Sequence, residues 1–160
     1  MRPLAGVSER IYRRPAKGGA PNVLFLQAAI EDLPDELNGI AREVHVQFPW
    51  GSLLRGIATG DDLILRSLRR LCRNEARVEV IIGVDAKRDQ SELERLRMPE
   101  LSVKYLEGEL VPKYESHGFE VVDFGVLSAS ESPEIESSWA KRLRQSKTRV
   151  LIYLCAVARF

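Results

Sequence analysis

Apolar and polar residues alternate over positions 43–47 (EVHVQ), and this period of two predicts a β-strand with one buried face. The strand pattern stops at the stretch FPWGS, residues 48–52. Pro49 lacks an N–H donor and holds the residue before it extended, and Gly51 permits a turn that a side chain would disfavour. We therefore predict a constrained corner that presents Trp50 at a strand end, where open α/β sheets bind ligands.

The rest of the hydrophobic pattern predicts further strands and helices. Apolar runs of strand length predict four more strands, at 22–27, 76–84, 119–126 and 149–158. Helical periodicity and end signals predict helices at 1–14, 61–73, 90–97, 109–117 and 139–144. For the charged segment 85–108, a substrate-recognition insertion is an alternative to a surface helix. The order of the elements predicts an α/β domain with a mainly parallel sheet.

The composition is that of a folded, nearly neutral protein. With 160 residues, 44% hydrophobic and 29% charged, the chain is long enough for one compact domain, and we take residues 1–160 as that domain. The formal charge of +1 means that affinity for nucleic acid has to come from local patches. Five basic residues lie within 1–20, and six lie within 137–160, where there is no Asp or Glu. Because no apolar run approaches 18 residues and no signal peptide is recognisable, we expect a soluble cytoplasmic protein.

The spacing of cysteine and histidine predicts neither a metal site nor a disulfide. Cys72 and Cys155 lie in separate apolar patterns, so we expect buried thiols that are not oxidised. His45 and His117 fall in unrelated segments, and we interpret His117 as a helix-end residue that is favourable to the helix dipole.

Two tryptophans and one acidic residue are the candidates for binding a flat ring. Trp50 stands at a strand end, while Trp139 lies among hydroxyl side chains directly before a basic run. Packing in the core or at its edge is the alternative for each, but two such side chains suggest a sandwich around an aromatic ring. Glu31 follows the run 22–27 and two small residues, where it can accept hydrogen bonds from an adenine or a ribose. The alternative is that Glu31 and Asp32 favour the start of a helix.

Three stretches, RRPAKGGAPNVLFLQAAIEDLP, FPWGSLL and SSWAKRL, resemble in this order and spacing the aminoglycoside-resistance 16S ribosomal RNA methyltransferases of the Kam and Npm type. The resemblance covers nearly the whole chain from about Arg10 onward. It implies that S-adenosylmethionine is the cofactor, that N1 of the decoding-site adenine in the 30S subunit is the target, and that the protein is a monomer. Because N1 of adenine already carries a lone pair, such an enzyme flips and positions the base and needs no general base.

The resemblance also implies the residues of the site. Trp50 and Trp139 are expected to stack the flipped adenine and so to be the catalytic residues. The cofactor is expected to contact Ile30, Glu31, Gln47, Phe48, Pro49, Trp50, Gly51, Ser52, Ser137, Ser138 and Trp139. The backbone of the ribosomal RNA is expected to contact Arg13, Arg14, Lys147 and Arg149.

The fold that the resemblance implies is a Rossmann-like class I methyltransferase sheet with strand order 3-2-1-4-5-7-6 and an antiparallel last strand. Such enzymes begin with a strand, a Gly-rich turn and a second strand, so we predict an N-terminally truncated sheet without its first two strands. A gap then lies between the runs 22–27 and 43–47, and we expect an exposed sheet edge or aggregation. Two other functions fit the residues: a non-catalytic RNA-binding remnant, or an adenine-nucleotide-binding domain unrelated to RNA.

Overall fold

The computed structural model describes residues 15–17, 19–20, 22–128 and 149–160. These residues belong to two units, and the boundary lies between Asp32 and Leu33. In the first unit the structure has two short 3-10 helices, η1 (Pro15–Lys17) and η2 (Ile30–Asp32). The second unit contains the sheet, the longer helices and the predicted corner.

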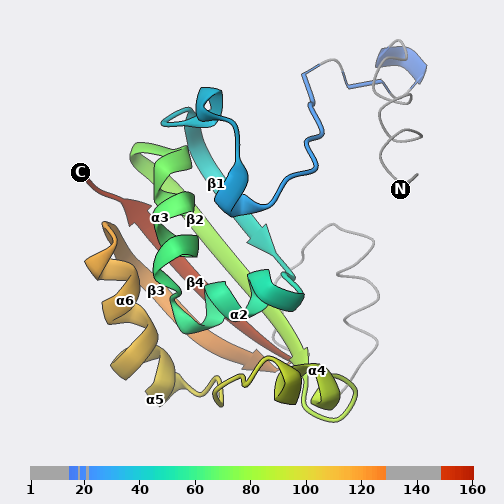
Figure 1. Cartoon of the computed structure of the whole chain (residues 1–160), viewed down its shortest axis with the longest axis vertical. Helices are drawn as coiled ribbons and strands as arrows, with labels where there is room; N and C mark the ends of the chain where they lie inside the picture. Colours follow the sequence, from blue (N-terminus) through green and yellow to red (C-terminus); the bar gives the residue numbers. More distant parts are fainter. Residues whose placement is uncertain (1–14, 18, 21, 129–148) are drawn as a thin grey trace. The chain divides into compact units, whose positions relative to one another are not determined.

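A four-stranded mixed sheet forms the centre of the second unit (Figure 1). The strands are β1 (Ala41–Gln47), β2 (Cys72–Asp85), β3 (Phe119–Ser128) and β4 (Arg149–Ala158), in the order β1-β2-β4-β3. β1 and β2 are parallel, whereas β4 is antiparallel to both of its neighbours. The predicted antiparallel last strand is therefore confirmed. β1, β2 and β3 run in the same direction and only β4 is reversed, which agrees with the prediction of a mainly parallel sheet for the strands described.

Helices α2, α3 and α6 lie over one face of this sheet (Figure 1). The helical segments of the second unit are η3 (Asp35–Leu37), α2 (Gly51–Thr59), α3 (Asp62–Leu71), α4 (Gln90–Arg95), α5 (Val103–Tyr105), the π-helical turn η4 (Leu106–Leu110) and α6 (Val111–Ser116). Asp61 caps α3, since its carboxylate accepts the N–H groups of Leu63 and Ile64. Gly60 ends α2 with a φ of 65°, which glycine adopts without a steric penalty.

The core lies between these helices and the covered face of the sheet. Side chains of a strand alternate between its two faces, so every second residue of β2 points into the core. The buried residues of β2 on this face are Ala76, Val78, Val80 and Ile82. The helices contribute Leu54, Ile57, Leu65, Leu68, Leu106, Leu110 and Tyr114. The hydroxyl of Tyr114 donates to the carbonyl oxygen of Ile57 at 3.1 Å and so links α6 to α2.

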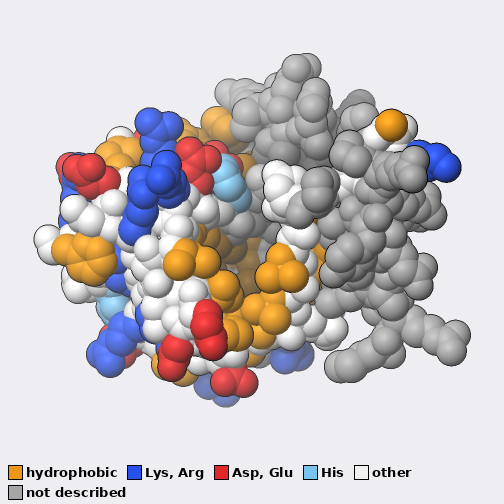
Figure 2. Space-filling model, turned by 90° about the horizontal axis from the view of Figure 1, so that it is seen from above, with side chains coloured by type: hydrophobic (Ala, Val, Ile, Leu, Met, Phe, Trp, Pro, Cys, Tyr) orange, Lys and Arg blue, Asp and Glu red, His pale blue; other side chains and the backbone are white. Residues whose placement is uncertain are grey.

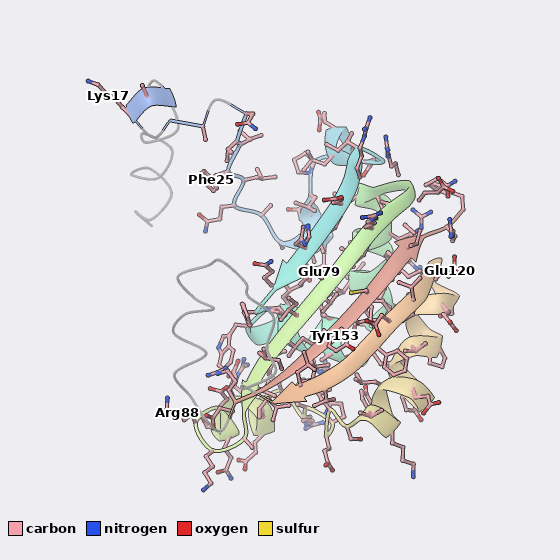
Figure 3. The ribbon with its side chains drawn as sticks, turned by 180° about the vertical axis from the view of Figure 1, so that it is seen from behind. Lys17, Phe25, Glu79, Arg88, Glu120 and Tyr153 are labelled. Atoms are coloured by element: carbon pink, nitrogen blue, oxygen red, sulfur yellow. The ribbon has the colours of Figure 1, made fainter. Side chains whose placement is uncertain are left out.

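The opposite face of the sheet carries charged as well as apolar side chains. Seen from behind in Figure 3, the strands lie in front of the helices, with Glu79, Glu120 and Tyr153 labelled on them. A hollow of about 320 Å³ on this face is lined by Glu79, Ile81, Asp123, Leu127, Leu151, Tyr153 and Cys155. The two faces therefore differ: one is closed by helices, and the other presents carboxylates beside apolar side chains.

The strand predicted at 22–27 does not form. Residues 23–29 have no regular secondary structure, and Leu24 is 82% exposed. A strand needs a neighbouring strand to satisfy its N–H and C=O groups, and no strand of the described residues pairs with this run. β1 stands at the end of the strand order, which agrees with the predicted exposed sheet edge.

The other predicted elements form with shifted bounds. The helix predicted at 61–73 ends at Leu71, because the chain enters β2 at Cys72. The helix predicted at 109–117 is the last part of a helical stretch that begins at Val103. The helices predicted at 1–14 and 139–144 lie outside the described residues. No helix in the part of the chain that the structure describes is long and apolar enough to span a membrane.

Candidate functional site

β1 ends in the corner that the sequence predicts, but the backbone there differs from the prediction. The N–H of Phe48 donates to the carbonyl oxygen of Ile81 at 2.7 Å, so Phe48 continues the pairing of β1 with β2. The φ of Phe48 is 51°, in the left-handed region, whereas the prediction had this residue extended before Pro49. The Phe48 ring packs over Gly83 of β2, where an added Cβ would lie 3.1 Å from its Cδ1. Packing against a glycine thus accompanies the strained turn that leaves the sheet.

Trp50 is presented at the start of α2. It is the residue that precedes the helix, its backbone is extended, and 52% of it is exposed. Gly51 follows with a φ of 62°, and nothing lies within 4 Å of the position that a Cβ would take. Pro49 is buried, so the corner is anchored at the proline and open at the tryptophan. An exposed ring on an anchored corner suits stacking on a ligand better than it suits core packing.

The end of β2, just beyond Gly83, carries a network of carboxylates and backbone groups. Asp85 is fully buried, and its Oδ1 accepts the N–H groups of Lys87 and Arg88, each at 3.1 Å. Asp89 accepts the N–H of Asp85 through Oδ2 at 2.9 Å. Sequence reasoning missed both carboxylates as parts of the site. The available signal was an Asp directly after an apolar strand, with a second Asp four residues later.

Arg149 is joined to this network. Its Nη1 donates to the carbonyl oxygen of Gly83 at 2.8 Å and lies 3.4 Å from Oδ2 of Asp89. The side chain of Arg149 is 14% exposed and that of Asp89 is 13% exposed, so the ion pair is largely removed from water. The resemblance implies that Arg149 contacts ribosomal RNA, and this role stays a prediction; in this structure its guanidinium group contacts Gly83 and Asp89.

The remaining predicted residues fall in different parts of the chain. At the corner, Gln47 and Ser52 are exposed and Phe48 is half-buried. Ile30 and Glu31 belong to η2 in the first unit, where Ile30 is half-buried and Glu31 is exposed. The predicted residues outside the described part of the chain are Arg13, Arg14, Ser137, Ser138, Trp139 and Lys147. Within the second unit, the corner and Arg149 both lie against Gly83 of β2, and the roles expected of the other residues stay predictions.

The hollow on the opposite face of the sheet contains a phenol and a thiol. The hydroxyl of Tyr153 donates to Oδ1 of Asp123 at 3.4 Å. Desolvation raises the pKa of Tyr153, and the charge of Asp123 adds to this effect. Desolvation also raises the pKa of the Cys155 thiol, with Glu79 and Asp123 adding to it. Both groups stay protonated at neutral pH, so neither is activated as a nucleophile.

Charges of both signs are mixed among the described residues on the face drawn in Figure 2. Figure 2 shows Lys and Arg side chains next to Asp and Glu, rather than a wide patch of one sign. Some of these charges are paired along helices: Arg66 lies 2.7 Å from Asp62, and Arg95 lies 2.7 Å from Glu92. The face seen in Figure 2 therefore gives little support to binding RNA by net charge alone.

Comparison with known proteins gives a consistent result over nearly the whole chain. A family model described as "NpmA: 16S rRNA (adenine(1408)-N(1))-methyltransferase" matches residues 1–158. The chain is 38% identical over 143 residues to the 16S rRNA (adenine(1408)-N(1))-methyltransferase of Streptoalloteichus hindustanus. That alignment covers 89% of this chain and 65% of the relative, so the chain spans just under two thirds of the relative's length.

Solved structures of similar proteins share the fold. The aminoglycoside resistance methyltransferase NpmB1 has a TM-score of 0.80 and 39% sequence identity, with 98% of this chain and 71% of that chain covered. A variant of the 16S rRNA (adenine(1408)-N(1))-methyltransferase from Catenulisporales acidiphilia, determined with the cosubstrate SAM, has a TM-score of 0.82 and 35% identity. Here 98% of this chain and 70% of that chain are covered.

Proposed function

Because the chain belongs to the NpmA family of 16S rRNA (adenine(1408)-N(1))-methyltransferases, we propose that it methylates N1 of adenine 1408 of 16S rRNA in the 30S subunit. The observation that carries the proposal is the exposed Trp50 on the anchored corner at the end of β1. A related enzyme was determined with SAM, and another is an aminoglycoside resistance methyltransferase. We extend both properties, the cofactor and the resistance, to this chain.

The corner fits part of a nucleoside-like cofactor. The space at Gly51 is open, and the Trp50 ring beside it is accessible to a flat group. The residues that would hold S-adenosylmethionine are Ile30, Glu31, Ser137, Ser138 and the corner from Gln47 to Ser52. When bound, this cofactor supplies a methyl group attached to a positively charged sulfur. The corner residues orient the acceptor base toward that methyl group, which is catalysis by positioning.

The chain's own groups have two tasks in this proposal. Trp50 and Trp139 stack the adenine after it leaves the RNA helix, and each such contact contributes about 1–3 kcal/mol. Arg13, Arg14 and Lys147 bind phosphates and set the register of the protein on the RNA. No side chain has to remove a proton, because N1 of adenine attacks with its own lone pair.

A methyl-transfer assay tests the proposal directly. Purified 30S subunits are incubated with the 160-residue chain and S-adenosylmethionine labelled in the methyl group, and the modified base is mapped by primer extension. We expect a block at adenine 1408 for the unaltered chain. Trp50→Ala should lower the rate by about 5- to 150-fold, the kinetic equivalent of one lost stacking contact. Trp50→Phe should retain most of the rate, because it keeps a flat ring.

The controls separate the proposed activity from simpler explanations. Val122→Ala removes part of another exposed apolar side chain, on β3, and should leave the rate unchanged. Circular dichroism of each variant shows whether it is folded. Salt-dependent binding of 30S subunits without any methyl transfer would contradict the enzymatic proposal and favour an RNA-binding protein without catalysis.

A further inference from the structure

We propose that the outer edge of β1 is an interface through which two copies of this chain pair, with their β1 strands antiparallel about a two-fold axis at Val44. The proposal goes beyond the proposed function and does not rest on it. It differs from the monomer that the resemblance implies. Its basis is the direction of the backbone groups of β1, together with the charges on either side of Val44.

β1 has one edge that is paired and one that is not. It stands at the end of the strand order, beside β2 (Figure 1). The N–H of Phe48 donates to the carbonyl oxygen of Ile81 in β2. Because the backbone groups of successive residues point to alternate sides of a strand, the even-numbered residues of β1 point toward β2. The N–H and C=O groups of Glu43, His45 and Gln47 therefore point outward, and they have no partner among the described residues.

The outward groups of two copies can pair with each other about a two-fold axis perpendicular to the sheet. With the axis at Val44, Glu43 of each copy lies opposite His45 of the other, and the two residues exchange N–H···O=C bonds. Gln47 lies opposite Ala41, so the pairing extends over all seven residues of β1. Residues that lie directly opposite each other have their side chains on the same face. The dimer therefore has two Glu–His pairs on the open face of the joined sheet.

The charges favour this register over its neighbours. With the axis at Glu43, two carboxylates would lie directly opposite each other, which is destabilising. With the axis at His45, two imidazoles would lie opposite each other, and Glu43 would face the uncharged Gln47. Of these three registers, the one centred on Val44 is the one that places each carboxylate opposite an imidazole.

The imidazole of His45 has one nitrogen available for this contact. Its Nδ1 lies 3.3 Å from Oε1 of Glu79 in β2. Its Nε2 lies 3.9 Å from Oε2 of Glu43 in the same copy, which is too far for a hydrogen bond. The side chains of His45 and Glu43 are 50% and 61% exposed. A carboxylate of the second copy can therefore reach Nε2 without displacing Glu79.

The other face of β1 supports the same arrangement. Val44 and Val46 pair in register with Val78 and Val80, so they lie on the face that the helices cover, and both are half-buried. In the dimer Val44 packs against Val44 of the other copy, and the apolar stem of Arg42 covers Val46. The pairing thus removes apolar surface from water at the edge of the core.

The proposed dimer leaves the candidate site outside the interface. In an antiparallel pair, the end of β1 in one copy lies beside the start of β1 in the other. The two Trp50 corners then lie at opposite ends of the joined strands, and neither tryptophan contributes to the pairing.

Sedimentation equilibrium of the 160-residue chain tests the proposal without any methyl transfer. A pairing of two seven-residue strands is small, so we expect a dimer that dissociates on dilution. Glu43→Lys should raise the dissociation constant by about 10-fold, because an ammonium group then replaces the carboxylate that faces each His45. Glu115→Lys, the same change at an exposed position of α6, is the matched control and should leave the constant unchanged.

Two changes at His45 separate the backbone from the side chain. His45→Pro removes an outward N–H that β2 does not use, and it should abolish the dimer. His45→Gln keeps this N–H and a polar side chain, so it should weaken the dimer less than His45→Pro does. Circular dichroism of each variant shows whether it is folded.

Cross-linking tests the register. In an antiparallel ladder, a pair of residues without hydrogen bonds has its Cα atoms about 4.5 Å apart, a distance that a disulfide can span. Val44→Cys should therefore form a disulfide-linked dimer under mild oxidation. Val46→Cys, which faces Arg42 of the other copy, should remain unlinked on a non-reducing gel. The unaltered chain is the control for the two free cysteines, Cys72 and Cys155.

Three outcomes would overturn the proposal. A chain that sediments as a monomer at every concentration has no such interface. A dimer that persists unweakened in folded Glu43→Lys and His45→Pro variants pairs through another surface. Loss of the dimer in Leu24→Asp, with an intact dimer in Glu43→Lys, would assign the interface to the exposed run 22–27. Because none of these measurements uses methyl transfer, a failure of the proposed function is recognised separately.

Discussion

Two apolar runs of this chain are both predicted to form strands, but only one of them does. Residues 149–158 (RVLIYLCAVA) form β4, which lies between β2 and β3, and Leu154 is 2% exposed. Residues 22–27 (NVLFLQ) form no strand, and Leu24 is 82% exposed. The difference is that β4 has a hydrogen-bonded neighbour on each side and helices over one face. An apolar run is suited to a strand, but the strand forms only where neighbouring strands pair with its backbone.

The substitution with the largest expected effect on stability shortens a side chain in β4. Leu154→Ala should lower the free energy of unfolding by about 2–5 kcal/mol, because it leaves a cavity in the closed side of the sheet. Urea unfolding followed by circular dichroism measures the change. Leu24→Ala is the matched control and should stay within about 0.5 kcal/mol of the unaltered chain. An equal decrease in the free energy of unfolding for Leu154→Ala and Leu24→Ala would show that the run 22–27 is packed in solution.

The next test concerns the helices that close one face of the sheet. Tyr114→Phe removes the hydrogen bond from α6 to the carbonyl oxygen of Ile57 and keeps the buried ring. We expect the free energy of unfolding to fall by about 1 kcal/mol, the usual net value of one such bond. Thermal unfolding by calorimetry measures the change, and Tyr105→Phe, at a half-buried tyrosine bonded to Ala58, offers a comparison. An unchanged unfolding temperature would mean that the hydroxyl contributes nothing to the link.

A smaller, pH-dependent effect is expected where α3 meets α6. Asp62 accepts a hydrogen bond from Nε2 of His117 at 2.8 Å, and this bond is the main cause that lowers the pKa of Asp62. A lowered carboxyl pKa stabilises the fold above about pH 4, the unfolded value, and the contribution disappears as the pH falls through the lower folded value. Asp62→Asn should therefore reduce stability at pH 6 and have little effect at pH 2.5.

Urea titrations of both proteins at the two pH values measure this difference. Glu107→Gln, at an exposed carboxylate of η4, is the control and should show no such pH dependence. A difference between Asp62→Asn and the unaltered chain that persists at pH 2.5 would contradict the role of the charged pair.

The smallest expected effect on stability belongs to the unpaired run. Leu24→Asp places a charge on an exposed apolar segment and should leave the unfolding curve unchanged. It should, however, reduce light scattering of concentrated samples, because an exposed run of high β-propensity without charges promotes association. Leu26→Asn, a neutral polar change at a position that is 51% exposed, separates the effect of charge from that of lost apolar surface.

The sequence predicted most of the second unit because local pattern and partners agree there. The alternation at 43–47 and the apolar runs of β2, β3 and β4 all form the strands that they predict. The run 22–27 was mispredicted because periodicity contains no information about which strand lies beside it. The backbone of Phe48 was mispredicted because the preference of a residue before proline yields to the pairing with Ile81 and the packing on Gly83.

Of the two predicted tryptophans the structure describes Trp50, which lies at the predicted corner, and the polar network beside that corner was missed. The turn residues around Trp50 are visible in the sequence, and the structure places that ring at an exposed corner. The network joins Arg149 to Asp89, 60 positions earlier in the chain, and no local pattern predicts such a pairing. The RNA contact of Arg149 was implied by the family resemblance and stays a prediction, whereas the burial of its side chain depends on tertiary packing that the sequence does not show.

The central position of β4 has a consequence for biosynthesis. This strand pairs with β2 and β3, yet the ribosome produces it after both. Until β4 emerges, the edges of β2 and β3 that later pair with it have no partner strand. Val78 of β2 pairs with Ala156 of β4, almost 80 residues later in the chain. Contacts of such long sequence separation slow folding, since the chain has to close a large loop before they form. The nascent chain is therefore most exposed to aggregation, and most dependent on chaperones, just before its last strand is made.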